Sequence, residues 1–197
     1  HASILAIAGL SIGLFSLILT LSIIKGFENL LDEKLSRIDG KVRVQNILGN
    51  PISKPERLDS LLSDIDLPLE IAPYIRGTAM IRKGGYTDGI IIEGVNKIPN
   101  QIYFDLESHT ISKHGIIIGK TLADGMGIRI GERVIITPLI NSIKHSINQK
   151  FNLLKVIGFF DSGMQEYDKT IAYISIDKAK DMFEMDNAIS GYTINGS

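Results

Sequence analysis

The feature that most constrains the fold is an uncharged stretch near the start of the chain. From Ala2 to Ile24 the sequence contains no Asp, Glu, Lys or Arg. As a helix rising 1.5 Å per residue it would be roughly 35 Å long, enough for a hydrocarbon core about 30 Å thick. A buried soluble helix seldom runs this far without a charge, and the segment that follows offers no small-residue cleavage site for a signal peptidase. We therefore expect a transmembrane helix over residues 1–25.

Composition excludes several classes of function. Among 197 residues, 21 basic and 22 acidic side chains nearly cancel, so nothing favours nucleic acid as a partner. The chain has no cysteine, which excludes disulfides, Cys-type zinc sites and thiol nucleophiles. The four histidines show no metal-ligand spacing, and the segment 115–121 has too few residues between its glycines for a phosphate-binding loop. We expect a non-catalytic chain without cofactor or metal.

The residues after the span continue with helical periodicity. Apolar residues recur at 27, 30, 31, 35 and 38, which predicts an amphipathic stalk helix over 26–40 that ends at Gly40. Residues 41–45 then alternate as a strand, with Val42 and Val44 expected to face the core.

Residues 41–197 mix strand and helix patterns, which predicts one α+β domain, with a smaller inserted lobe within 84–130. Residues 96–114 have no clear pattern. Strands are expected at 70–82 (broken at Pro73 and Gly77), 86–95, 115–119, 132–139, 151–160, 170–176 and 191–194, and helices at 56–65, 120–126 and 178–184, the last capped by Asp177.

One short stretch is more distinctive than the rest. A strand ends at Phe160, an Asp-Ser-Gly turn follows, and a polar excursion leads to the next strand. We interpret this stretch first as a structural turn, and second as a contact for a partner subunit.

Four motifs in this order resemble the permease subunits of lipoprotein-releasing (Lol-type) ABC transporters. Their joint occurrence with the membrane span carries the resemblance. They are Lys25-Gly26-Phe27, the segment 117–123 (IIGKTLA), Gly131-Glu132-Arg133-Val134, and the segment 158–168, whose family-like residues are Ser162, Gly163, Met164, Glu166, Tyr167 and Asp168.

The resemblance implies a porter-like periplasmic domain with an inserted lobe, held on helical stalks above the bacterial inner membrane. Such a domain is similar to the extracytoplasmic domains of MacB-type exporters and FtsX-type permeases. It also implies three further membrane helices, a second permease subunit and a separate cytoplasmic ATPase. In that family the cargo is a lipidated protein, which passes to a periplasmic carrier.

A carrier-binding hairpin of the family would correspond to residues 138–150. The resemblance makes this segment a candidate partner-contact loop, although it lacks the proline-rich character of the family's hook. The candidate contact residues are Pro138, Leu139, Ile140, Lys144 and His145.

Two other classes of protein fit the same pattern. A single-span sensor would have the same span and a mixed extracytoplasmic domain, and a secreted enzyme would require cleavage near residue 25 together with a polar cluster. The segment after residue 197 separates them. Three apolar spans there indicate a permease, whereas one long signalling helix indicates a sensor.

The uncharged stretch gives a direct prediction. Alkaline carbonate extraction of the intact protein should leave it in the membrane fraction, because roughly 35 Å of apolar helix spans the bilayer core. Release into the soluble fraction would contradict a transmembrane helix at residues 1–25.

Overall fold

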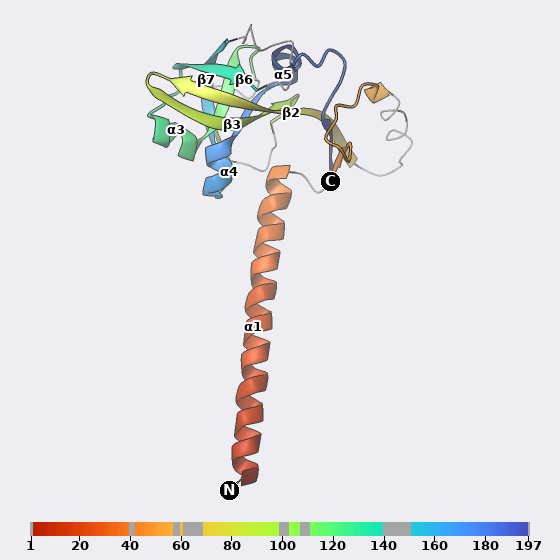
Figure 1. Ribbon diagram of the computed structural model, residues 1–197, viewed down its shortest axis with the longest axis vertical. Helices are drawn as coiled ribbons and strands as arrows, with labels where there is room; N and C mark the ends of the chain where they lie inside the picture. The colour runs from red at the N-terminus through yellow and green to blue at the C-terminus, as the bar shows by residue number, and fades with distance from the viewer. Residues whose placement is uncertain are drawn as a thin grey trace. The chain divides into compact units, whose positions relative to one another are not determined.

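The computed structural model describes residues 2–39, 42–56, 60, 69–98, 103–106, 111–139 and 151–196. The chain divides into two units, His1–Arg37 and Ile38–Ser197. Figure 1 shows the first as one long helix and the second as a sheet with short helices packed on it.

The first unit is formed by helix α1 (Ala2–Asp39), which runs without a break through the expected span and stalk, Gly26 included. Its segment Ala6–Leu30 has a mean hydropathy of 2.3 and is long and apolar enough to cross a membrane. The side-chain hydroxyls of Ser11, Thr20 and Ser22 donate to carbonyl oxygens four residues earlier at 2.8 to 2.9 Å. These bonds keep polar groups satisfied within the helix, as an apolar surrounding requires.

The second unit contains a nine-stranded sheet. Its strands are β1 (Val42–Gln45), β2 (Leu69–Lys83), β3 (Tyr86–Val95), β4 (Tyr103–Leu106), β5 (Gly115–Gly119), β6 (Arg133–Pro138), β7 (Asn152–Asp161), β8 (Ile171–Ser175) and β9 (Gly191–Gly196). Helix α3 (Lys120–Met126) follows β5, α4 (Gln165–Thr170) precedes β8, and α5 (Ile176–Phe183) follows β8. The fold is α+β, as expected.

Six of the strands close into a ring. The sheet order is β1-β9-β2-β3-β8-β5-β7-β4, and β6 pairs with both β2 and β7. The pairings therefore run β2-β3-β8-β5-β7-β6 and back to β2. Closure gives each ring strand a backbone partner on both sides, which removes the free edges that an open sheet would expose.

The interior of this ring is the main hydrophobic core. All six ring strands and helices α3 and α5 contribute buried side chains to one cluster. On β5, Ile116 and Ile118 belong to it, whereas Ile117 lies in a second cluster with Phe160 and Tyr173. Since successive strand residues face opposite sides, three consecutive isoleucines serve both cores.

The predicted break in 70–82 is wrong, because β2 is one continuous strand. Pro73 pairs only with β9, since the β3 ladder starts at Tyr74, so its missing N–H does not interrupt that ladder. Gly77 is required by packing: a Cβ there would overlap the ring of Phe183 on α5.

Other details also differ. Helix α5 is capped by Ser175, whose Oγ accepts from the Lys178 N–H at 3.3 Å, and Asp177 lies inside the first turn. Helix α4 and strand β4 were not predicted, because their sequences are short and weakly periodic. Val42 is exposed rather than inward, and Arg43 faces the core instead. The predicted helix 56–65 lies mostly outside the described residues.

Candidate functional site

The family-like turn after β7 is held by its own side chains. Gly163 has a φ of +73°, which glycine adopts without strain. Its N–H donates to Asp161 Oδ1 at 3.0 Å, and the Met164 N–H donates to Ser162 Oγ at 3.1 Å. The positive φ confirms the tight turn that the Asp-Ser-Gly sequence predicted.

Asp168 joins this turn to helix α4. Its side chain is 3% exposed, and Oδ1 accepts hydrogen bonds from the Ser162 N–H at 3.0 Å and the Ser162 Oγ–H at 2.6 Å. Burial raises the pKa of the Asp168 carboxyl, and the two bonds from Ser162 act in the opposite direction. The carboxylate therefore works as a local structural acceptor.

The remaining motif residues divide between core and surface. The Tyr167 hydroxyl bonds to that of Tyr173 at 2.8 Å, and its ring meets Phe160 edge-on with centroids 6.1 Å apart. Met164 packs against the same second core cluster. The Glu166 side chain is exposed. Glu166 is thus open to solvent, whereas Asp168 is committed to the turn.

Two family motifs that are distant in sequence meet at Gly119. A Cβ at Gly119 would overlap the carbonyl oxygen of Asp168, so only glycine lets the end of β5 approach α4 this closely. The segment 115–121 is a strand that runs into a helix, as expected, and its glycine serves packing.

The Gly131-Glu132-Arg133-Val134 motif builds another joint of the ring. The Glu132 carboxylate accepts hydrogen bonds from the Arg129 N–H at 2.7 Å and from the Lys83 ammonium. The Lys83 hydrogen bond, followed by that of Arg129, holds the pKa of Glu132 below its usual value. Gly131 has a φ of +89°, and its N–H donates to the Val156 carbonyl at 2.7 Å. The motif fixes the entry of β6 against β7 and the end of β2.

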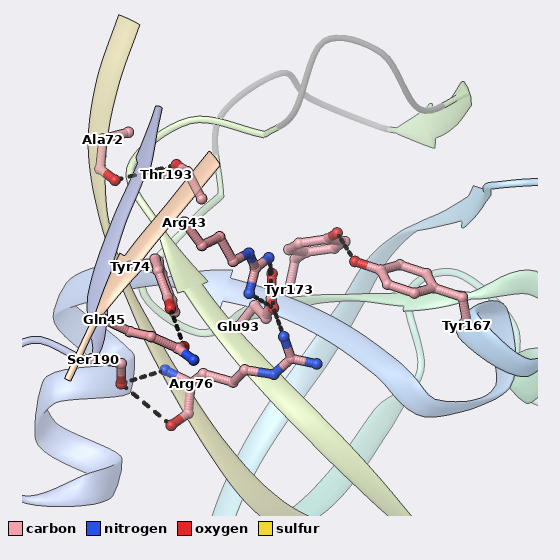
Figure 2. A network of polar contacts seen from close by, with 10 residues as sticks. All are labelled: Arg43, Gln45, Ala72, Tyr74, Arg76, Glu93, Tyr167, Tyr173, Ser190 and Thr193. Carbon is pink, nitrogen blue, oxygen red and sulfur yellow. Dashed lines mark hydrogen bonds and ion pairs between the residues drawn. The ribbon is translucent and has the colours of Figure 1, made fainter. Parts of the chain in front are cut away.

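A buried ion cluster was missed by sequence reasoning. Glu93 on β3 is 2% exposed, and its carboxylate accepts from the Arg43 guanidinium at 3.1 to 3.4 Å. Arg76 Nη1 lies 3.2 Å from Glu93 Oε1. Figure 2 shows the two guanidinium groups converging on this one carboxylate. A lone Glu in an isoleucine-rich strand was the available signal, but its partners come from two other strands.

Further polar contacts surround the cluster (Figure 2). The Arg43 guanidinium lies over the Tyr74 ring at 4.7 Å, and the Tyr74 hydroxyl donates to Gln45 Oε1 at 3.1 Å. The Ser190 Oγ accepts from the Arg76 N–H at 2.9 Å and donates to the Arg76 carbonyl at 3.4 Å. These contacts tie β1 and the entry to β9 onto β2 and β3.

The candidate loop 138–150 begins and ends beside an exposed apolar surface. Pro138 is buried at the end of β6, and Leu139 is 49% exposed. Ile140, Lys144 and His145 lie outside the described residues. We use the name outer patch for the exposed or half-buried apolar side chains Met80, Ile135, Leu139, Phe151 and Leu153 on and beside β2, β6 and β7.

Strand register explains why the outer patch is continuous. Met80 pairs with Thr137, and Ile135 pairs with Leu153, so these side chains share the outward face. The Arg82 guanidinium lies 5.8 Å from the centroid of the Phe151 ring. Among the described residues, no group of three or more acidic or histidine side chains is placed to hold a metal ion.

Comparison with known proteins identifies the family. The model of the MacB-like periplasmic core domain matches residues 3–195. The chain belongs to this family. The match confirms the resemblance predicted from the four motifs, and it includes nearly all of α1 as well as the sheet.

Individual relatives agree with this family. The lipoprotein-releasing system transmembrane protein LolC of Neisseria meningitidis serogroup B is 23% identical over 202 residues, covering 96% of this chain and 48% of LolC. LolC of Xylella fastidiosa strain Temecula1 is 23% identical over 198 residues, covering 93% and 46%. The chain thus spans about half the length of these relatives.

A solved structure supports the fold. The periplasmic region of MacB from Actinobacillus actinomycetemcomitans matches with a TM-score of 0.51 at 12% identity, covering 78% of this chain and 66% of that one. At this identity the likeness concerns architecture, and it agrees with the mixed α+β sheet of the MacB-like core domain.

The buried carboxylate of the turn gives a stability prediction. Asp168→Ala leaves the two Ser162 donors without their acceptor and should lower the free energy of unfolding by about 1 to 3 kcal/mol. Glu166→Ala, an exposed change in the same helix, should stay within about 0.5 kcal/mol of wild type. Urea unfolding of both variants is the measurement, and equal effects would contradict the structural role of Asp168.

Proposed function

We propose that this chain is the N-terminal part of an ABC transporter permease subunit that releases lipoprotein-like cargo from the bacterial inner membrane. The observation that carries the proposal is the family match, which extends over the apolar helix and the extracytoplasmic domain together. The names of the LolC relatives, lipoprotein-releasing system transmembrane proteins, suggest the lipoprotein class of cargo. The chain itself acts without catalysis.

The proposal assigns the parts of the chain. Residues 1–25 span the inner membrane, residues 26–40 form the stalk, and residues 41–197 form the periplasmic domain, with the inserted lobe within 84–130. The partners are a cytoplasmic ATPase subunit, a second permease subunit and the lipid bilayer. The chain covers 48% of the LolC relative, which supports further membrane segments in the whole protein.

Helix α1 supplies the mechanical element of this mechanism. A continuous helix keeps every backbone hydrogen bond from the membrane through the stalk, so it bends little under load. Nucleotide-driven motion at its membrane end would then reach the periplasmic domain. The alternative is that α1 only tethers the domain, in which case a flexible joint would be harmless.

A Gly-Gly insertion between Leu31 and Asp32 tests whether α1 acts as a rigid lever, that is, whether it transmits motion to the periplasmic domain. It should abolish cargo release while ATP hydrolysis continues, because it costs about 1 kcal/mol of helix propensity per glycine and rotates the apolar stripe by about 200°. Both rates are measured in the reconstituted full-length complex. An Ala-Ala insertion at the same point is the matched control, since it rotates the stripe equally but preserves the helix. Release at the wild-type rate with Gly-Gly inserted would eliminate the lever.

The outer patch and the loop 138–150 form the proposed contact with a periplasmic lipoprotein carrier. The support is chemical: a carrier of acylated proteins is expected to present apolar surface, and Leu139, Phe151 and Leu153 are 49%, 63% and 54% exposed. Pro138 anchors one end of the loop by its pairing with Ala79. Ile140, Lys144 and His145 remain proposed contact residues.

Leu153→Glu tests the carrier contact. A charge in the patch should weaken carrier binding by about tenfold or more, because a few apolar anchors dominate affinity at an interface. Ile47→Glu is the matched control, since Ile47 is 100% exposed in the turn after β1. Binding of a purified carrier to the full-length protein in nanodiscs is the readout. Equal binding of wild type and Leu153→Glu would place the carrier elsewhere.

Two other functions remain as alternatives. The MacB structure and the family match are equally compatible with a mechanotransmission permease for another cargo or partner. A single-span sensor ectodomain is the more distant alternative. The number of membrane spans after residue 197 separates sensor from permease, and cargo release in the reconstituted complex separates the two permeases.

A further inference from the structure

Strand β1 is attached to the domain by a short backbone ladder. It begins at Val42, three residues after α1 ends at Asp39. Its four residues pair with β9, from Val42 with Ile194 to Gln45 with Gly191. Because β9 lies outside the closed ring and pairs with β2, the backbone connection from β1 to the ring passes through two strand interfaces.

Arg43 provides a direct connection that bypasses this route. In the sheet order β1 and β3 are three strands apart, which in a flat sheet would place them about 14 Å apart. Yet the Arg43 guanidinium donates to the Glu93 carboxylate on β3 at 3.1 to 3.4 Å. The Arg43 side chain therefore reaches from β1 to a strand that is not its neighbour, and Figure 2 shows it extending to Glu93.

Glu93 is a rigid anchor for this contact. It is 2% exposed, and its backbone pairs with Arg76 on one side and Tyr173 on the other, so it is fixed within the ring. Arg76 holds the same carboxylate at 3.2 Å. Removing Arg43 would leave a buried carboxylate with less compensation, which makes this pair harder to separate than an exposed ion pair.

We propose that Arg43 and Glu93 are positioning residues that latch β1 to the ring, so that β1 moves with the ring as one body. The inference rests on the proposed function for its consequence, since it names the contact through which the lever would act. Without the latch, β1 keeps its four-residue ladder with β9 and the hydrogen bond from Tyr74 to Gln45, and we expect a pull on β1 to separate it from the ring more easily.

Hydrogen exchange on the full-length protein in nanodiscs tests the latch itself. Arg43→Ala should speed amide exchange in β1 by about tenfold or more beyond any increase in β3 and β8. Arg43→Lys, which keeps the charge but loses the paired donors, should lie between the two. Val134→Ala is the control for general destabilisation, because Val134 is buried in β6, which does not pair with β1. Unchanged β1 exchange in Arg43→Ala would overturn the latch.

Coupling in the reconstituted complex tests its consequence. Cargo released per ATP hydrolysed should fall about fivefold or more in Arg43→Ala, and should remain near wild type in Val134→Ala assayed below its unfolding temperature. A wild-type ratio in Arg43→Ala would overturn the coupling role. If the wild-type complex releases no cargo on ATP hydrolysis, the proposed function fails, and the exchange experiment still decides whether Arg43 holds β1.

Discussion

The pairing of β6 with both β2 and β7 is the contact on which the rest of the domain depends. It converts a curved sheet into a closed ring and creates an interior that all six strands fill with buried side chains. The burial of these side chains supplies the main stabilisation, because burying apolar area contributes about 25 cal/mol per Å². Everything outside the ring, including β1, β9 and the turn before α4, is positioned by how it attaches to this frame.

The motifs that resemble lipoprotein-releasing permeases lie at joints of that frame. Gly119 lets β5 approach Asp168, the Asp168 carboxylate closes the turn after β7, and Glu132 holds the segment that enters β6. Their chemistry is hydrogen bonding and close packing within the domain. The motifs therefore identify the family through its architecture, and contact with a partner at the outer patch is the proposal made above.

Few charged side chains are buried among the described residues of this domain: Glu93, Asp168 and Lys178. The position of Glu93 shows how separate strands are held together. Glu93 is surrounded by apolar strands, yet it is compensated by Arg43 and Arg76 from two different strands. An apolar side chain at position 93 would avoid the desolvation cost but would pack without selecting partners. A charged anchor with directional bonds selects Arg43 and Arg76 as its partners, which ties β1 to the ring.

The sequence by itself determined the long helix, most strands and the family. These follow from local patterns: the uncharged run of α1, the run of three isoleucines in β3, and glycines such as Gly163 whose turn needs a positive φ. Only the tertiary structure decided that β2 continues through Pro73, that the strands close into a ring, and that Arg43 rather than Val42 faces inward. Each of these depends on a partner far away in the chain. Local periodicity does not specify a partner that is distant in the sequence. Only the assembled fold therefore shows which strands pair and which carboxylate an arginine contacts.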